Sequence, residues 1–279
     1  MTYVNLAFYK FVELQDLTAL RASLKEFCIA RGLKGTILIG HEGINCTIAG
    51  SRQSIDELKS HLDSDPRFSM LPYKESVSDH QPFTRMLVKI KKEIIAFGID
   101  VHPATHRAPS VTPEVLKQWL DEGRDLILLD TRNDYETLTG KFKNAHELQI
   151  RTFRAFPEKA KELPEEWKDK TIVSYCTGGI RCEKAAPYLQ QIGFKNVYQL
   201  EGGILKYFEE CGGAHYEGEC FVFDYRIGLN PGLHETETAH CPICQFPVTA
   251  ENQKLDTYVA GKHCPNCVSS VKAPQTASG

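Results

Sequence analysis

The sequence has little of several features that would mark a broad class of protein. It has no excess of positive charge, because 33 lysine and arginine residues stand against 36 acidic ones and the net charge is -3. A global field that attracts nucleic acid is therefore excluded, and any basic patch must be local. It has no stretch of about eighteen apolar residues and no secretory leader pattern at its start. We therefore expect a cytoplasmic protein with no membrane partner.

Motifs for redox cofactors are also missing. The sequence has no GxGxxG fingerprint for a flavin or nicotinamide nucleotide, and no convincing set of two histidines and one carboxylate for iron. It therefore names no redox cofactor, and it does not indicate an oligomeric state. Cysteine, in contrast, is plentiful, with ten residues. Because the cytosol keeps thiols reduced, metal binding or catalysis explains them better than a disulfide framework.

The first part of the chain predicts a ferredoxin-like α+β domain over residues 1–98. Strand and helix patterns alternate there as β-α-β-β-α-β, which is the split ferredoxin-like arrangement. We expect its second helix to begin at Ser54, with Glu57 completing a capping box. The last strand is expected within TRMLVKIKKEIIAFG, residues 84–98.

The rest of the chain divides where the pattern changes. Residues 99–112 contain two prolines and little periodicity, and they predict a linker. Residues 113–212 alternate helices with short, continuous apolar strands, which is typical of a parallel α/β domain. Residues 213–279 have few apolar side chains and four paired cysteines. They end in the polar stretch KAPQTASG, residues 272–279, which we expect to be disordered.

One loop of the α/β domain carries the clearest sign of chemistry. The segment CTGGIRCEKA begins at Cys176, directly after the apolar run TIVSY, and a helix is predicted from near Arg181. The loop N-H groups and the helix N-terminus favour negative charge, so Cys176 is expected to be a thiolate. Gly178 and Gly179 let the backbone approach closely. Cys176 could instead be an ordinary buried cysteine, but the strand, glycines, arginine and helix together favour function.

Four ordered motifs resemble those of rhodanese domains. They are DTRNDYE (Asp130, Arg132, Glu136), GKFKNA (140–145), CTGGIRC, and LEGGILKY (200–207). Four residues separate Cys176 from Arg181, a smaller cradle than a Cys-x5-Arg phosphatase loop, and one that suits sulfur. The resemblance implies that Cys176 carries a persulfide and that Asp130 and Arg132 support the loop. Alternatively, Asp130 and Arg132 simply pair with each other or with nearby backbone.

Cys182, in the first turn of the predicted helix, has two interpretations. It could resolve an oxidised Cys176 as a disulfide, or it could pack beneath the helix. The spacing in the sequence does not show whether the two sulfur atoms can meet at disulfide distance. Both interpretations stay open at this point.

Three segments outside the rhodanese part resemble a narrower group, the rhodanese-related tRNA uridine hydroxylases. They are residues 35–50, 79–98 and 218–229, with Cys46 where we expect a glycine, which puts the local turn geometry in doubt. The resemblance implies oxygen-dependent conversion of the wobble uridine, position 34, to 5-hydroxyuridine. It implies molecular oxygen as co-substrate and the tRNA anticodon loop as partner. We add the hypothesis that Cys176 attacks uracil C6 and leaves an enolate at C5, whose oxidation needs an electron source.

Two other functions remain open on the sequence. A thiosulfate-type sulfurtransferase would use the same loop to pass a persulfide sulfur from Cys176 to an acceptor thiol. An RNA-binding or scaffold protein with a relic loop would need neither Cys176 nor Arg181, and the presence of both argues against it. The step from rhodanese to hydroxylase rests on the family resemblance.

Local basic residues are candidates for RNA contacts. They are Arg85, Lys89, Lys91 and Lys92 near the end of the first domain, and Lys141, Lys143, Arg151 and Arg154 near the crevice of the α/β domain. Any one of them is more simply a solvated surface charge. As a set they predict a track for backbone phosphates.

Two CxxC pairs predict a structural zinc site. Cys241 and Cys244 are separated by nineteen residues from Cys264 and Cys267, which fits the spacing of zinc knuckles. Four thiolates complete a closed tetrahedral site, and a segment with so few apolar residues needs such a staple to fold. We therefore predict a structural role, with presentation of a surface to RNA as one use of it. Two disulfides or an unoccupied redox cluster are the alternatives.

Overall fold

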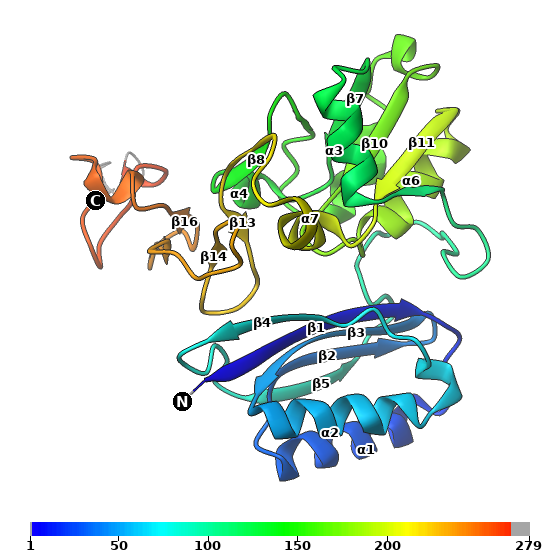
Figure 1. Ribbon diagram of the computed structural model, residues 1–279, viewed down its shortest axis with the longest axis vertical. Helices are drawn as coiled ribbons and strands as arrows, with labels where there is room; N and C mark the ends of the chain where they lie inside the picture. The colour runs from blue at the N-terminus through cyan, green and yellow to red at the C-terminus, as the bar shows by residue number, and fades with distance from the viewer. Residues whose placement is uncertain (1, 269–279) are drawn as a thin grey trace, which may run out of the picture.

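Two five-stranded β-sheets organise the chain, and each carries its own helices (Figure 1). The computed structural model describes residues 2–268. The tail predicted to be disordered, residues 272–279, lies outside the described residues. Within residues 2–268, no helix is both long enough and apolar enough to cross a membrane.

The first sheet confirms the predicted ferredoxin-like α+β arrangement. Its elements are β1 (Tyr3–Phe11), α1 (Leu17–Ala30), β2 (Lys34–Gly40), β3 (Gly43–Gly50), α2 (Arg52–Asp63), β4 (Lys74–Ser78) and β5 (Met86–Ile90). The strand order is β4-β1-β3-β2-β5. The first four strands pair in antiparallel fashion, and β5 is added at the edge, parallel to β2.

The fourth strand of the ferredoxin-like pattern does not lie where the sequence predicted it. β4 fills that place, and the stretch 84–98 instead supplies the added edge strand β5. The β4 sequence, KESVS, has Val77 as its one apolar residue, whereas MLVKI in β5 is largely apolar. Because strand patterns are recognised by apolar and β-branched residues, the polar strand carried little signal.

The predicted helix start at Ser54 was also wrong. α2 begins at Arg52, and Ser51 is its N-cap, with a side chain that accepts a hydrogen bond from the Ser54 N-H at 3.1 Å. The Ser54 hydroxyl donates instead to the carbonyl of Arg31, at 2.9 Å. Glu57 forms an ion pair with Arg31, so it does not complete a capping box.

The strands of the first sheet present different side chains on their two faces. Leu6, Phe8 and Ile37 point into the core beneath α1 and α2. Cys46 belongs to the same core and lies inside β3, so the position where a glycine was expected is in a regular strand and not in a turn. The opposite face, which includes Tyr9, is turned toward the second sheet (Figure 1). Side chains alternate along a strand, so a single sequence supplies both faces.

The second sheet confirms the predicted parallel α/β domain. Its order is β6-β11-β10-β7-β9, and every neighbouring pair is parallel. Helices cover both faces and form two cores, one with α5 and α6 and one with α3 and α7. The elements of this part are β6 (Ser110–Val111), α3 (Pro113–Asp121), β7 (Leu126–Asp130), α4 (Asp134–Thr137), β8 (Gly140–Phe142), β9 (His146–Glu147), α5 (Phe156–Ala160), β10 (Thr171–Tyr175), α6 (Cys182–Gln191), β11 (Asn196–Leu200) and α7 (Gly203–Cys211).

The stretch predicted as a linker, residues 99–112, is partly built into this second domain. Val101 and Ala108 are buried in the core beside α6, and β6 pairs with β11 at the sheet edge. Phe97, just before the stretch, packs its ring against Tyr188 of α6. The domain limits at 98, 112 and 212 stay a prediction.

The C-terminal part contains short strands and a 3-10 helix, Asn252–Lys254. The strands are β12 (Tyr216–Gly218), β13 (Cys220–Phe221), β14 (Gly228–Leu229), β15 (Ala239–His240) and β16 (Pro247–Val248). β12 pairs with β8 of the α/β domain. The Arg226 guanidinium donates to the hydroxyl of Ser76 in β4 at 2.6 Å, and the N-H of Tyr225 donates to the carbonyl of Pro82 at 3.2 Å. Residues 222–226 thus bridge the two domains on one side.

Candidate active site

Cys176 lies directly after β10, at the carboxyl edge of the parallel sheet. Its loop runs through Arg181 into α6, as the sequence predicted. Gly179 has a φ of +99°, and a Cβ atom there would lie 2.9 Å from the hydroxyl of Tyr9, so glycine is required at this position. The N-H of Gly179 donates to the Cys176 sulfur at 3.1 Å. Gly178 has open space around it and no positive φ, so no such requirement holds there.

The loop favours a thiolate at Cys176. Burial alone raises the pKa of this thiol, but the neighbouring thiol of Cys182, the Arg181 charge and the N-H groups of Arg181 and Gly179 together lower the pKa to about 5. Burial and the negative charge on Cys176 raise the pKa of Cys182 far above its ordinary value. Of the two sulfur atoms, Cys176 therefore carries the negative charge and Cys182 keeps its proton.

Arg181 is fixed by a buried carboxylate. Its guanidinium donates to both oxygens of Glu136, at 2.5 and 2.7 Å, and both side chains are buried. Glu136 also accepts from the N-H of Asn133, at 3.0 Å, and from the hydroxyl of Thr177, at 3.3 Å. The motif DTRNDYE contained Glu136, but sequence reasoning did not identify its partner. The capping-box spacing from Asn133 was the available signal.

Asp130 and Arg132 form a buried ion pair beneath the loop. The Arg132 guanidinium donates to Asp130 at 3.0 and 2.6 Å, and to the carbonyl of Gly140 at 2.7 Å. Both side chains are fully buried. Asp130 is the register partner of Tyr175, the residue before Cys176. The pair is therefore placed to hold the end of β10 and does not line the cavity described next.

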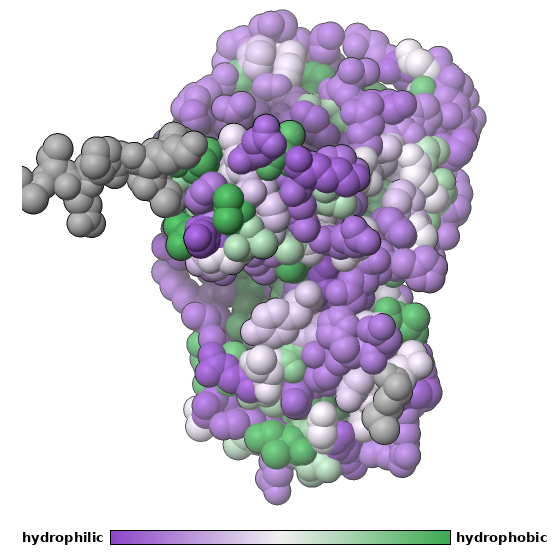
Figure 2. Space-filling view, turned by 90° about the vertical axis from the view of Figure 1, so that its left-hand side faces the viewer, coloured by the Kyte–Doolittle hydropathy of each residue, from purple (hydrophilic) through white to green (hydrophobic). Residues whose placement is uncertain are grey.

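A cavity of about 760 Å³ opens over Cys176. Several separate parts of the chain line it. They include the open face of the first sheet, the Cys176 loop, residues 152–154, and Val222, Phe223, Asp224 and Arg226 of the bridging segment. Arg154, one of the predicted RNA-binding residues, also lines it. Figure 2 shows apolar surface set back between the upper and lower parts of the molecule, on the side where the C-terminal segment lies.

Sequence reasoning missed Tyr9 and Lys74, two of the polar side chains that the first sheet contributes to this cavity. The Tyr9 hydroxyl, from β1, donates to Glu183 at 3.2 Å, and burial together with Glu183 raises the pKa of Tyr9 well above its usual value. The Lys74 ammonium group, from β4, lies 5.5 Å from the ring centroid of Tyr9 and forms no side-chain hydrogen bond or ion pair within residues 2–268. Burial lowers the pKa of Lys74, and the negative charge of Cys176 partly offsets this decrease. Alternation along YVNLAFYKF was the signal for Tyr9, because it places Tyr9 opposite Phe8.

Buried ion pairs hold the first sheet over the loop. Lys184 of α6 is 1% exposed, and its ammonium group lies 2.8 Å from Glu42 and 3.0 Å from Glu93, both from the first part of the chain. Glu183, next to it, accepts from Arg107 at 2.7 Å and 3.0 Å. The helix that follows the Cys176 loop is thereby tied directly to the N-terminal part.

Comparisons with known proteins agree with this arrangement. Residues 3–94 match the model of the UPF0176 acylphosphatase-like domain, and residues 112–210 match that of the rhodanese-like domain. The chain is 52% identical over 274 residues to the tRNA uridine(34) hydroxylase of Cupriavidus taiwanensis, covering 96% of this chain and 97% of that protein. The chain belongs to the tRNA uridine(34) hydroxylase family. The family member from Paraburkholderia xenovorans is 50% identical, over 99% of this chain and the whole of that protein.

The predicted RNA-binding residues fall into separate places on this family member. Arg85 and Arg151 line a second pocket beside the Cys176 cavity. The five lysines of the set line neither of these two pockets. Lys89, Lys91 and Lys92 are exposed at or just after β5, and Lys143 is exposed as well. Lys141 forms an ion pair with Glu147. The structure brings together two of the eight around one pocket and places Arg154 at the other.

The four predicted metal ligands lie together. Their sulfur atoms are all within 4.8 Å of one another, with 3.7 Å between Cys241 and Cys267, 3.5 Å between Cys244 and Cys264, and 3.8 Å between Cys264 and Cys267. A tetrahedral zinc ion with Zn–S bonds of about 2.3 Å needs sulfur atoms about 3.8 Å apart. The cluster thus fits zinc, and the four cysteines pack with Val248 in a small core.

Proposed function

We propose that this protein hydroxylates uridine 34 of tRNA at C5 and consumes dioxygen. One observation supports this most: a cysteine favoured as a thiolate lines a cavity of about 760 Å³, in a chain that is about half identical, over nearly its full length, to proteins named tRNA uridine(34) hydroxylase. A cavity of this size is within the range of about 300–1,000 Å³ typical of small-molecule pockets. It has room for a nucleoside.

Access of the base to Cys176 supports the anticodon loop as the substrate segment. A wobble uridine is already single-stranded, so moving it into a pocket costs less than flipping a base out of a duplex. The apolar walls of the cavity, which include Leu38, Phe83 and Val222, suit the faces of a pyrimidine ring. Thr36, Asn45 and Thr47 supply polar groups on the side of the first sheet.

The proposed chemistry starts with attack of the Cys176 thiolate on C6 of uracil. The electron pair of the C5–C6 bond moves to form an enolate over C5, C4 and O4. C5 then bonds to dioxygen and becomes a C5 peroxide anion. Two thiols are oxidised to a disulfide and supply two electrons and two protons, which together with one further proton from solvent reduce the peroxide anion to an alcohol and water. Loss of the C5 proton and breakage of the C6–S bond release 5-hydroxyuridine and the thiolate. A persulfide on Cys176, predicted by the rhodanese resemblance, would attack through its terminal sulfur in the same way.

The surrounding residues have distinct roles in this proposal. The N-H of Gly179 and the Arg181 charge stabilise the thiolate before attack and again on release. Glu136 holds the guanidinium of Arg181 in place. Lys74 lines the cavity and has no ion-pair partner within residues 2–268, and we assign it to the developing charge of the uracil enolate. Cys182, protonated beneath the loop, donates to Cys176 and is the candidate for a resolving thiol.

The alternative, a sulfurtransferase, is less well supported. Transfer of one sulfur atom to a small acceptor needs the loop of Cys176 but not a cavity built jointly by the first sheet and residues 222–226. The loop alone cannot distinguish the hydroxylase from the sulfurtransferase, because both reactions begin with a reactive Cys176. The cavity and the names of the full-length relatives favour hydroxylation.

We also propose that the metal held by the four cysteines is zinc and that its role is structural. The four thiolates leave no open coordination position, so the ion would stabilise the local fold and would not act as a Lewis acid for the substrate. Cys241 and Cys244 lie beside Gln245 and Phe246, which line the second pocket. A bound zinc would therefore fix the wall of that pocket. The cytoplasmic location stays a prediction.

Mass spectrometry of tRNA nucleosides tests the proposed activity. Cells from which the gene is deleted would be complemented with wild type or with Cys176→Ala. We expect 5-hydroxyuridine and its derivatives to disappear on deletion and to return only with wild type. Unchanged nucleosides, in cells shown to have no overlapping route to this modification, would contradict hydroxylation and favour the sulfurtransferase.

A further inference from the structure

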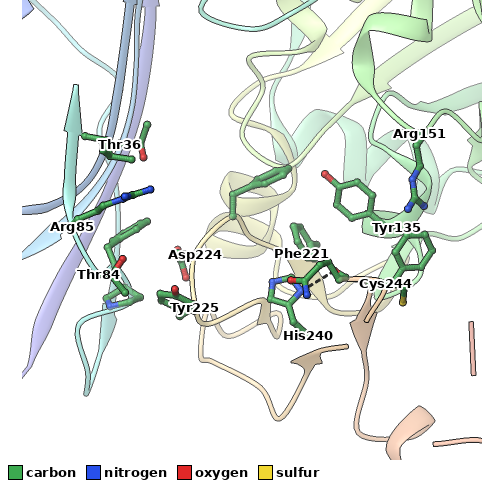
Figure 3. Close-up of a pocket in the computed structure, with 16 residues that line it drawn as sticks. Thr36, Thr84, Arg85, Tyr135, Arg151, Phe221, Asp224, Tyr225, His240 and Cys244 are labelled. Carbon is green, nitrogen blue, oxygen red and sulfur yellow. Dashed lines mark hydrogen bonds between the residues drawn. The ribbon is translucent and has the colours of Figure 1, made fainter. Parts of the chain in front are cut away.

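A second pocket, of about 500 Å³, opens beside the Cys176 cavity (Figure 3). Its walls come from residues 82–87 around the start of β5, from Tyr135 and Arg151 of the α/β domain, and from residues 221–246 of the C-terminal part. It shares Thr36, Phe83, Phe223 and Asp224 with the Cys176 cavity. The two hollows are therefore adjacent, and we call the second one the aromatic groove.

Aromatic rings dominate the aromatic groove. Phe221 lies edge-on to Tyr135 and to Phe223, with ring centroids 5.5 and 5.2 Å apart. Phe223 is 56% exposed and Tyr225 is 60% exposed, although both lie on the bridging segment between the domains. Apolar and aromatic side chains that stay exposed inside a hollow are typical of binding surfaces. The Arg181 guanidinium lies 5.8 Å from the ring centroid of Phe223, so the Tyr225 ring is the more available of the two to a partner.

Two arginines stand on opposite sides of these rings (Figure 3). Arg85, beside β5, is exposed and forms no ion pair or side-chain hydrogen bond within residues 2–268. The Arg151 guanidinium lies 4.1 Å from the ring centroid of Phe246, and 3.6 Å from Asp134. A path of flat rings with a cation at either side is complementary to unpaired bases on a phosphate backbone. This pattern distinguishes the groove from a purely apolar site, which would have no use for Arg85.

We propose that the aromatic groove binds the nucleotide next to the target uridine, with its base stacked on Tyr225 and its phosphates near Arg85 and Arg151. The proposal rests on the proposed function, because the shared walls with the Cys176 cavity are what place a neighbouring nucleotide there. Stacking tolerates every base, since each has a π-face. The groove thus contributes affinity for single-stranded RNA and sets the direction of the strand, while the Cys176 cavity selects the uridine.

Binding of an RNA hairpin to the full-length protein tests this proposal directly. A fluorescent hairpin with the sequence of an anticodon arm and uridine at position 34 would be titrated by anisotropy. From the usual contribution of one stacked base, Tyr225→Ala should raise Kd about 5- to 140-fold, whereas Tyr225→Phe, which keeps the ring, should stay within about twofold of wild type. Tyr225 is exposed, so its truncation leaves the core intact; circular dichroism would check this.

Abasic hairpins make the test specific for stacking. Two such hairpins would each carry an abasic nucleotide at one of the two positions next to the uridine. For one of the two, the Kd of wild type should rise by the same factor as the Tyr225→Ala substitution causes. Tyr225→Ala should then lose nothing more, because the base it would contact is already gone. Independent losses that multiply, or an unchanged Kd for Tyr225→Ala, would overturn the proposal. So would equal competition by a peptide that carries no phosphate.

Arg85→Ala gives an independent variant at the other wall. Removal of one phosphate contact should reduce the dependence of log Kd on log salt by about one unit of slope. The binding readout also separates this inference from the proposed activity. If wild type makes no 5-hydroxyuridine but the variants lose hairpin binding, hydroxylation is refuted and the aromatic groove remains supported as an RNA-binding site. Hydroxylation by wild type with unchanged hairpin binding in both variants would do the reverse.

Discussion

Arg181 and Glu136 form a two-fold hydrogen-bonded ion pair inside the protein, with N–O distances of 2.5 and 2.7 Å. Arg181 comes from the loop that begins at Cys176, and Glu136 from the short helix α4 after the neighbouring strand. Because both side chains are buried, the guanidinium cannot turn to solvent. The pair therefore fixes a positive charge next to the thiolate.

Removal of the Glu136 charge should destabilise the protein strongly. In Glu136→Gln the buried guanidinium of Arg181 loses its counter-charge, and breaking such a pair costs about 3–5 kcal/mol. Urea unfolding would measure the free energy of unfolding. Glu158→Gln is the matched control, since Glu158 pairs with Lys161 at an exposed position and its loss should cost less than about 1 kcal/mol. Equal losses for the two variants would contradict the buried pair.

The low pKa of Cys176 predicts a pH-dependent contribution to stability. The folded pKa is about 5, and an unfolded cysteine titrates near about 8.5. Between these values the unfolded chain binds more protons, so the stability that the thiolate adds is fully present above about pH 8.5 and is lost as the pH falls toward about 5. The difference in unfolding free energy between wild type and Cys176→Ser should therefore increase with pH in this window. A difference that is constant with pH would show that Cys176 is a thiol.

The Cys176 loop could be predicted from the sequence because its parts are contiguous. The strand, the glycines, Arg181 and the following helix all lie within about twenty residues, and local rules suffice to read them. Gly179 is required by its positive φ and by the nearby Tyr9 hydroxyl, and that second reason was invisible in the sequence. The same holds for Glu136, whose partner is forty-five residues away.

The cavity could not be predicted, because several segments that are distant in the sequence build it. Lys74 lies in β4, a polar strand with little pattern, and its approach to Cys176 depends on how the two sheets pack. In the sequence, Phe223 and Tyr225 belong to a segment that resembles the family, but nothing there indicates which residues they contact or which surface they line. The packing of domains depends on long-range pairs such as Lys184 with Glu42 and Glu93, which periodicity does not encode.

Lys184 should be essential for the position of the first sheet over the loop. Lys184→Ala leaves Glu42 and Glu93 facing each other without their shared cation, and we expect the free energy of unfolding to fall by about 1–3 kcal/mol, since both carboxylates keep some contact with water. Limited proteolysis should cut faster between residues 94 and 112. The triple variant Lys184→Met, Glu42→Gln and Glu93→Gln removes the charges together and should recover much of the loss. Failure of this recovery would show that the charge balance is not the cause.

Zinc should be present at one ion per chain in protein purified under reducing conditions, because the sulfur distances of 3.5–3.8 Å in the cluster match a tetrahedral thiolate site. Metal analysis by mass spectrometry would measure it. Cys264→Ser should lose the zinc, whereas Cys28→Ser, which changes a buried thiol of the first core, should keep it.

Since Cys244 and Phe246 share the wall of the aromatic groove, metal loss should also weaken hairpin binding about as much as Tyr225→Ala. Alkylation of Cys176 should stay unchanged, because its thiolate depends on Arg181, Cys182 and the loop amides and not on the metal. Full hairpin affinity in the zinc-free protein would separate the metal from the groove, and a protein mass four hydrogens lower would identify two disulfides instead.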